Sequence, residues 1–273
     1  MADTEDLSLE RVAFDTEREG FDLFRAACLL PRIEGREPDV RHCVEQVEAM
    51  GRALKQRLPR DEDGHARELV AHLFGELGFD GDRSEYDAPS NSFLVDVIER
   101  RRGLPVALSL LTVAVAEAAG MRAFGVALPR HFIVGVSGAR GFSLIDPFNK
   151  GRTLDADDIE GLTGVGGLDV VGHAVAQTSP RAILMRMLAN LHGSYLRRGD
   201  REPLVRVLSR MLLFEPRHPA LLVQRAQVRV EVGEFAEARL DIQTALGLSP
   251  DVDVKRAAEE MLRRLDEGQR YLN

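Results

Sequence analysis

The sequence predicts an α+β core that is preceded by helices and followed by an all-α repeat array. Three observations lead to this fold class. Helical patterns in the N-terminal part end at proline or glycine, a long apolar segment precedes short alternating segments, and glycine and proline recur at one fixed spacing near the C-terminus. A chain of 273 residues has room for about two domains. We expect these domains at residues 1–178 and 179–273.

The composition is that of a globular protein and excludes several classes. Hydrophobic residues make up 44% and charged residues 29%, which argues against a disordered or collagen-like chain. The net charge of −8 argues against nucleic acid as a binding partner. No apolar run reaches the length of a membrane-spanning helix, and the acidic N-terminus differs from a signal peptide. We therefore expect a cytoplasmic protein that binds neither nucleic acid nor membrane.

The charge is unevenly distributed along the chain. The part before Pro180 carries 20 basic and 31 acidic side chains, a net charge of −11. The part from Pro180 onward carries 16 basic and 13 acidic side chains, a net charge of +3. This asymmetry indicates two separately built units, one acidic and one mildly basic.

Three helices are expected in the N-terminal region. They cover residues 7–29, 39–58 and 61–77, and each is followed by a proline or a glycine that ends it. Asn91 and Ser92 then precede a short helix over residues 93–98 and are expected to cap it. The run from Glu99 to Arg102 is interpreted as a solvated helix end rather than a phosphate site.

The centre of the first domain is predicted from an apolar segment. From Val106 to Ala119 only three residues are polar, so a helix here must be buried on nearly every side. Pro105 suits the first turn of that helix, where its missing N–H costs no hydrogen bond. Strand-like segments follow at residues 122–128, 131–136 and 142–145. A helix packed on an antiparallel sheet is the result.

A candidate acid–base pair lies at the ends of two of these strands. A four-residue loop between the second and third strands would place His131 opposite Asp146, with Cβ atoms about 4.5–5.5 Å apart. A carboxylate beside an imidazole fixes its tautomer and stabilises the imidazolium, which is how a general base is prepared. The alternative interpretation is a structural hydrogen bond.

The C-terminal domain contains a sequence repeat. Gly199 and Gly233 are separated by the same spacing as Pro216 and Pro250, and this spacing is that of a tetratricopeptide repeat. Large, small, turn and proline positions of such a repeat are occupied in the second copy by Leu222, Ala226, Gly233, Phe235, Ala238, Ile242, Ala245 and Pro250. The looser first copy has Leu188, Tyr195, Leu204, Leu208 and Met211 at the equivalent positions. About two repeats and a capping helix near residues 254–271 are predicted, and such a short array is expected to pack on other parts of the chain.

Four sequence blocks occur in order along the first domain. They are Asn91-Ser92-Phe93-Leu94, Arg101-Arg102-Gly103-Leu104-Pro105, Leu128-Pro129-Arg130-His131-Phe132 and Ile145-Asp146-Pro147-Phe148-Asn149. With the surrounding residues, about 23–158, they resemble the transglutaminase-like domain of the SirB family, in which tetratricopeptide repeats follow. The resemblance implies a papain-like fold, in which a cysteine at the start of the central helix is activated by a histidine and an aspartate. His131 and Asp146 match that general base and orienting acid.

The chain departs from this pattern at the nucleophile. In active transglutaminase-like domains the cysteine stands at the start of the helix that a glycine closes, and counting back from Gly120 places that position at Pro105. Proline has neither a thiol nor a hydroxyl. Ser109 is the nearest hydroxyl, and a serine inside a helix is expected to be buried or to bond to a backbone carbonyl. Cys28 and Cys43 are expected to be packing residues of the N-terminal helices.

These observations lead to a non-catalytic adaptor with a binding or regulatory role, and neither a metal nor another cofactor is expected. The pocket at His131 and Asp146, with Asn91, Ser109 and Asn149, is expected to bind a ligand rather than cleave it. The alternative is a cysteine-less hydrolase or acyl-transfer enzyme that uses His131 as base and Asp146 as orienting acid.

A protein or peptide partner is expected at the repeats. The predicted register places polar, locally basic residues along the inner groove, which suits an acidic or carboxylate-ended peptide. These residues are Arg186, Asn190, Arg197, Gln224 and Gln227. The competing possibility is that the acidic first domain covers this groove.

Overall fold

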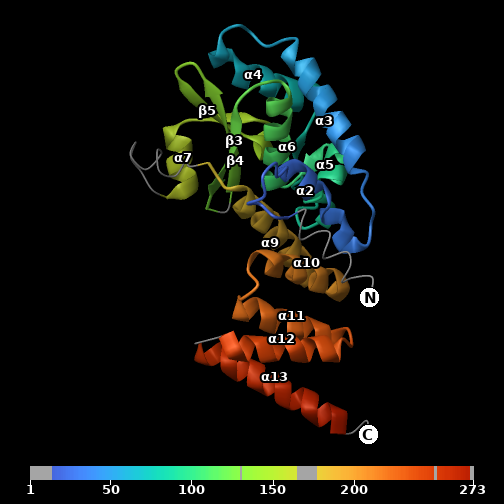
Figure 1. Cartoon of the computed structure of the whole chain (residues 1–273). Coiled ribbons are helices and arrows are strands. Elements are labelled where there is room, and N and C mark those ends of the chain that lie inside the picture. Colours follow the sequence, from blue (N-terminus) through green and yellow to red (C-terminus); the bar gives the residue numbers. More distant parts are fainter. Residues whose placement is uncertain (1–13, 130, 165–176, 249–250, 271–273) are drawn as a thin grey trace. The chain divides into compact units, whose positions relative to one another are not determined.

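The structure is a computed structural model that describes residues 14–129, 131–164, 177–248 and 251–270. It confirms the α+β fold class, with a central helix, an antiparallel sheet and a helical C-terminal region (Figure 1). Contacts divide the chain into two compact units. The first spans Thr16–Met187. The second joins the residues from Leu188 onward to the N-terminal segment that contains Phe14, and the centre of the Phe14 ring lies 6.0 Å from that of Phe214.

The first unit begins with a series of short and long helices. They are α2 (Leu23–Cys28), the 3₁₀ helix η1 (Leu30–Glu34), α3 (Val40–Lys55), the 3₁₀ helix η2 (Glu62–Gly64), α4 (His65–Val70) and the π-helix η3 (Ala71–Glu76). The helix predicted over residues 39–58 is therefore present as the slightly shorter α3. The helix predicted over residues 61–77 is divided among η2, α4 and η3.

The expected helix over residues 7–29 is present only over its last turns, as α2 (Leu23–Cys28). Residues 14–22 form turns, and residues 7–13 lie outside the described residues. Gly20 has a left-handed φ of 74°, which interrupts a right-handed helix. The Asp22 carboxylate then accepts a hydrogen bond from the amide of Arg25 and starts α2 at Leu23.

The apolar segment forms the central helix α6 (Pro105–Ala118), as predicted. Pro105 occupies its first position, and every residue from there to Thr112 is buried. A Cβ atom at Gly51 of α3 would collide with the Cβ of Ala118, so the close contact between these helices requires glycine at position 51. The uniformly apolar sequence of α6 therefore matches its enclosed position.

The main sheet lies between helices on both faces. Its antiparallel strands follow in the order β3 (Ala123–Leu128), β4 (His131–Gly138), β5 (Gly141–Asp146) and β6 (Arg152–Leu154). The three predicted strands are confirmed, and β6 was not predicted. One face packs on Ile159 of α7 (Ala156–Thr163), while α6 lies on the other face (Figure 1).

A second, small sheet forms beside the start of α6. It consists of the parallel strands β1 (Asp80–Gly81) and β2 (Arg102–Gly103), with the 3₁₀ helix η4 (Pro89–Asn91) and α5 (Leu94–Arg100) between them in sequence. The expected capping of α5 by Asn91 and Ser92 is wrong. Phe93 is the N-cap residue of α5 and makes no side-chain capping hydrogen bond, because Asn91 ends η4 before the chain enters α5.

The second unit consists of antiparallel helix pairs. After α9 (Pro180–Arg198), which contributes to both units, come α10 (Arg201–Phe214), α11 (Pro219–Glu231), α12 (Phe235–Leu248) and α13 (Val252–Arg270). Gly199 and Gly233 have left-handed φ values of 76° and 84° at the turns within the two pairs. The repeated spacing of these glycines therefore has a backbone cause. Pro250, which marks the end of the second predicted repeat, lies outside the described residues.

The small residues of the second repeat let its helices approach each other. Ala226 of α11 packs with Ala238 and Ile242 of α12, and α13 adds Ala258 and Leu265 to the same cluster. The final helix thus covers an apolar surface that a third repeat would otherwise cover.

A buried ionic network crosses the second repeat. The Asp241 carboxylate of α12 accepts hydrogen bonds from Arg225 Nε and Nη2 at 2.8 and 2.6 Å and from Arg229 Nη1 at 2.7 Å. Arg225 Nη1 also donates to Ser209 Oγ of α10 at 3.1 Å. The side chain of Asp241 is only 6% exposed. A single carboxylate therefore contacts two guanidinium groups and links α11 to α12, while Arg229 Nε also lies 3.3 Å from Glu234 Oε2.

We expect Asp241→Asn to lower the free energy of unfolding by about 3 kcal/mol, because it leaves the largely buried Arg225 guanidinium without this counter-charge and removes one of the two carboxylates that face Arg229. Urea denaturation followed by circular dichroism measures this loss. The matched control is Asp253→Asn, since Asp253 pairs with Arg256 on the surface with a side chain 82% exposed. The control is expected to change stability by less than about 0.5 kcal/mol. Equal effects of the two substitutions would contradict the prediction.

Candidate functional site

A histidine and an aspartate meet where β4 begins and β5 ends. His131 Nε2 lies 2.8 Å from Asp146 Oδ2, and the two side chains are 12% and 3% exposed. Because an ionised carboxylate can only accept, Nε2 donates this hydrogen bond and Nδ1 is the acceptor nitrogen of the neutral ring. The geometry is that of an imidazole oriented by a carboxylate.

The strand register differs from the expected one. Gly138 pairs with Gly141, so the hairpin turn contains two residues rather than four. The ladder pairs Val134 with Ile145, and Asp146 is therefore level with Ile133, two residues away from His131. Since a shift of two residues keeps every side chain on its own face, His131 and Asp146 still share one face of the sheet. The predicted pair forms across a diagonal.

The Asp146 carboxylate also organises the chain that follows it. Its Oδ1 accepts from the amides of Phe148 and Asn149 at 3.0 and 3.2 Å, which caps the 3₁₀ helix η5 (Pro147–Asn149). Its Oδ2 accepts from Asn149 Nδ2 at 2.6 Å. Burial acts to raise the pKa of Asp146, but the hydrogen bonds from His131 and Asn149 outweigh it, so the pKa lies below its ordinary value.

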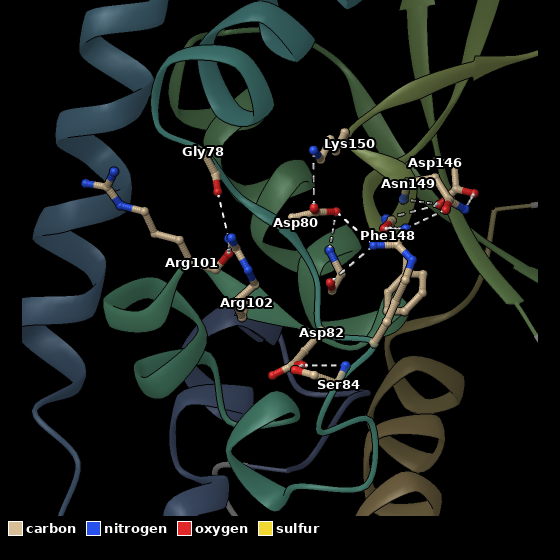
Figure 2. A network of polar contacts seen from close by, with 12 residues as sticks. Gly78, Asp80, Asp82, Ser84, Arg101, Arg102, Asp146, Phe148, Asn149 and Lys150 are labelled. Atoms are coloured by element: carbon tan, nitrogen blue, oxygen red, sulfur yellow. Dashed lines mark hydrogen bonds and ion pairs between the residues drawn. The ribbon is translucent and has the colours of Figure 1, made fainter.

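A distant segment braces η5 from the outside. Arg83 donates to the Phe148 carbonyl at 2.9 Å and to Asn149 Oδ1 at 2.7 Å, and its guanidinium lies 4.8 Å from the centre of the Phe148 ring. Asp80 lies 3.3 Å from Arg83 and 3.6 Å from Lys150, as Figure 2 shows for the Lys150 contact. The segment around β1 therefore holds the residues that contact Asp146.

The close approach of these segments depends on a glycine. A Cβ atom at Gly81 would collide with the Phe148 ring. The His131 and Tyr86 rings also lie edge to face with Phe148, with ring centres 6.4 and 5.9 Å away. No local sequence pattern points to Arg83, Asp80 or Gly81 as part of the site, because a long stretch of chain separates them from η5.

The arginine run binds the chain's own loop. Arg100 donates to Asp82 Oδ2 and Asn91 Oδ1, both at 2.9 Å. Arg101 donates to the Leu77 carbonyl at 2.7 Å, and Arg102 donates to the Gly78 carbonyl at 3.0 Å (Figure 2 shows the latter). These side chains hold the segment from Leu77 to Asp82 in place, so the run is a structural brace as well as a helix end.

The predicted pocket residues separate into two groups. Asn149 contacts Asp146 directly. Asn91 is buried and donates to the Glu85 carbonyl at 2.6 Å, which ties it to the loop beside Arg100. Ser109 is buried in α6 and donates to the Phe132 carbonyl at 3.3 Å. Asn149 therefore belongs to the His131 site, whereas Asn91 bonds to the Glu85 carbonyl and to Arg100, and Ser109 bonds to a backbone carbonyl.

Comparison with known proteins assigns this arrangement to a family. The pattern described as the transglutaminase-like superfamily matches residues 41–189, which is more than half of the chain. The chain belongs to the transglutaminase-like superfamily. A tetratricopeptide repeat pattern matches residues 191–263. This order of a transglutaminase-like domain followed by tetratricopeptide repeats confirms the resemblance to the SirB family.

The relatives of this chain differ in their sequence identity to it and in the share of their own length that it covers. A UPF0162 protein of Xylella fastidiosa (strain 9a5c) is 35% identical over 185 residues, which are 66% of this chain and 66% of that one. A UPF0162 protein of Pseudomonas aeruginosa is 27% identical over 78% of this chain and 77% of its own. Human F-box only protein 21 is 29% identical over 60% of this chain and 28% of its own length. The chain thus spans about two thirds of the first of these relatives.

The expected nucleophile position lies at the start of α6. Pro105 is buried there, and η5 contacts the same helix. The two cysteines of the chain are elsewhere, at the end of α2 and in the first turn of α3, and both are buried. The first unit therefore combines a paired histidine and aspartate with a central helix that begins without a thiol.

The predicted partner residues lie on α9 and α11. Arg197 and Gln227 are exposed, Arg186 and Asn190 are half-buried, and Gln224 bonds to His192. Arg186 belongs to the first unit and the other four to the second.

Neither a metal cluster nor a membrane-spanning helix is found in the described part of the chain. Among those residues, no group of three or more His, Cys, Asp and Glu side chains is placed to hold a metal ion. None of the helices described is both long enough and apolar enough to cross a bilayer.

We expect His131→Ala to raise the pKa of Asp146, because burial then acts without its strongest opposing hydrogen bond. A carboxyl with a lowered pKa in the folded state stabilises the fold above its unfolded value of about 3.9, and this contribution is lost as the pH falls through the folded value. Carbon-detected NMR titration of Asp146 measures the shift. Arg25→Ala, which removes a surface partner of Asp22, is the control and should leave the Asp146 titration unchanged. An unchanged midpoint in His131→Ala would contradict the role given to this hydrogen bond.

Proposed function

We propose that this chain is a non-catalytic binding or regulatory adaptor, in which the transglutaminase-like domain keeps its acid–base pair for structure and recognition. The observation that carries the proposal is Pro105 at the first position of α6, where the resemblance to the family places the nucleophile. Covalent acyl transfer needs a nucleophilic side chain at that point. Proline supplies none.

The hydroxyl groups within the central helix support the same proposal. The hydroxyl of Ser109 is buried and donates to the Phe132 carbonyl, and the hydroxyl of Thr112 donates to the Leu108 carbonyl at 2.7 Å. A serine or threonine that bonds to backbone inside a helix has a structural role. These two hydroxyls are therefore engaged.

The retained pair has a role that does not depend on catalysis. His131 and Asn149 are held by the same carboxylate, and Asp146 caps η5. Removing the Asp146 carboxylate would release both the His131 side chain and the loop that contains η5. The pair therefore has a structural reason to be present. The exposed side chains of Asn149, Lys150 and Tyr86 surround this position and offer polar and aromatic contacts to a partner.

We expect the native chain to show no active-site labelling by a thiol-reactive acyl-substrate mimic, because position 105 has no thiol. Pro105→Cys places a thiol at a helix N-terminus, where its pKa falls, and should be labelled. His131→Ala in the Pro105→Cys background should reduce that labelling, as measured by intact-protein mass spectrometry.

Two outcomes would overturn the proposal. One is stoichiometric labelling of Cys28 or Cys43 in the native chain that His131→Ala abolishes. The other is turnover of an amide or ester substrate by the native chain that His131→Ala abolishes, since this would show that His131 activates water directly.

The repeats are the proposed partner surface. Tetratricopeptide repeats generally mediate protein–protein interaction, and the residues from Pro180 onward carry a net charge of +3. The acidic first domain has the opposite sign, so an acidic peptide is favoured by the repeats and disfavoured by that domain. We infer that the ligand is an acidic or carboxylate-ended peptide bound along α9 and α11.

We expect Arg186→Glu combined with Arg197→Glu to weaken binding of a glutamate-rich peptide about tenfold or more, because two attractive charges become repulsive. Fluorescence anisotropy with the whole chain measures this change. The matched control is Arg256→Glu combined with Arg263→Glu, which makes the same charge change at exposed positions of α13. Equal binding by both double variants would remove the groove from consideration.

A further inference from the structure

One guanidinium nitrogen of Arg83 contacts two amide groups of η5. Arg83 Nη2 donates to the Phe148 carbonyl oxygen at 2.9 Å and to Asn149 Oδ1 at 2.7 Å. The nitrogen of each of these amide groups faces Asp146. The peptide N–H of Asn149 donates to Asp146 Oδ1 at 3.2 Å, and Asn149 Nδ2 donates to Asp146 Oδ2 at 2.6 Å. Two amide groups therefore connect the same arginine to the same carboxylate in parallel (Figure 2 shows Phe148, Asn149 and Asp146).

We propose that Arg83 is a positioning residue of the His131 site, which acts on Asp146 through these two bridging amides. The guanidinium and the carboxylate form an ion pair that is bridged by the Phe148–Asn149 peptide group and by the Asn149 side chain. This bridged pair holds the carboxylate toward His131. The proposal concerns the geometry of the site, so it does not rest on whether His131 and Asp146 bind a partner or support catalysis.

The direction of the hydrogen bonds follows from what each group can do. A guanidinium can only donate and an ionised carboxylate can only accept, so an amide between them turns its oxygen to Arg83 and its nitrogen to Asp146. Every hydrogen bond in the bridge has one charged partner, and hydrogen bonds in a chain polarise one another. Each amide therefore transmits part of the attraction of the guanidinium to the carboxylate.

The Asn149 side chain depends on Arg83 because residue 149 is exposed. Water competes for an exposed amide, and an amide held at one end only can rotate away from its partner. The hydrogen bond from Asn149 is one of the contacts that hold the pKa of Asp146 below its ordinary value against the effect of burial. Loss of Arg83 therefore weakens the support of a carboxylate that is only 3% exposed.

Arg83 is itself held beside η5 by the segment around β1. Its Nη1 lies 3.3 Å from Asp80 Oδ1, and its guanidinium lies 4.8 Å from the centre of the Phe148 ring. At the other end of the bridge, His131 Nε2 donates to Asp146 Oδ2, the same oxygen that accepts from Asn149. We therefore expect a change at Arg83 to reach the His131 ring.

The test compares Arg83→Met with Lys150→Met in the whole chain. Both substitutions replace a cation beside Asp80 by the same side chain, but the contact that Lys150 makes is with Asp80, at 3.6 Å, and its side chain is 71% exposed. We expect the pKa of Asp146 to rise in Arg83→Met, as measured by carbon-detected NMR titration, and to stay unchanged in Lys150→Met. Near neutral pH, the Nε2–H proton of His131 should exchange with water several-fold faster in Arg83→Met alone.

A double-mutant cycle separates the bridged path from a direct effect of charge. Asn149→Ala removes the side-chain bridge and leaves the peptide bridge, so Arg83→Met should raise the pKa of Asp146 less in that background than in the native chain. If Arg83→Met fails a circular dichroism check for folding, alanine replaces methionine at both positions. Equal effects of the substitutions at Arg83 and Lys150, or a shift from Arg83→Met that is the same with and without the Asn149 side chain, would overturn the proposal.

Discussion

The Asp146 carboxylate is the contact on which the site depends, because it satisfies several groups from different parts of the chain. It ends β5, caps η5 through two backbone amides, and accepts from His131 and Asn149. Burying a charge in this way is favourable only when enough donors replace water, and Asp146 has four such donors among the described residues. The orientation of the histidine is therefore a consequence of how the loop after β5 is built.

This construction gives His131 and Asp146 structural roles that do not depend on a nucleophile at the start of α6. Pro105 fits the first turn of α6 because that position needs no N–H, so the helix starts well without a cysteine. The Asp146 carboxylate caps η5 and orients His131, and Arg83 holds Phe148 and Asn149 of the same loop, so none of these contacts requires a nucleophile. Structural requirements for the histidine and the aspartate are separate from the requirement for a thiol.

The fold could be predicted where periodicity is strong, and the site where residue types are distinctive. The uniformly apolar helix from Pro105, the three alternating strands and the two repeats follow from local patterns. The register of the hairpin did not, because its turn has two residues and the sequence around Gly138 allowed a longer one. The face of His131 was still correct, since the error was an even number of residues. The contacts of Arg83 join segments far apart in the sequence and leave no local signal.

The repeat unit shows how a short array is stabilised by different means at each end. In the second copy, Arg225 and Arg229 turn into the helix pair and share Asp241, so charge replaces part of the apolar contact between α11 and α12. Such a network fixes the register of the two helices, because displacement would separate both guanidinium groups from the buried Asp241 carboxylate. Apolar contact is supplied instead by α13, which packs on Ala226 of α11 and Ile242 of α12. The charged brace positions the pair and the capping helix excludes water from it.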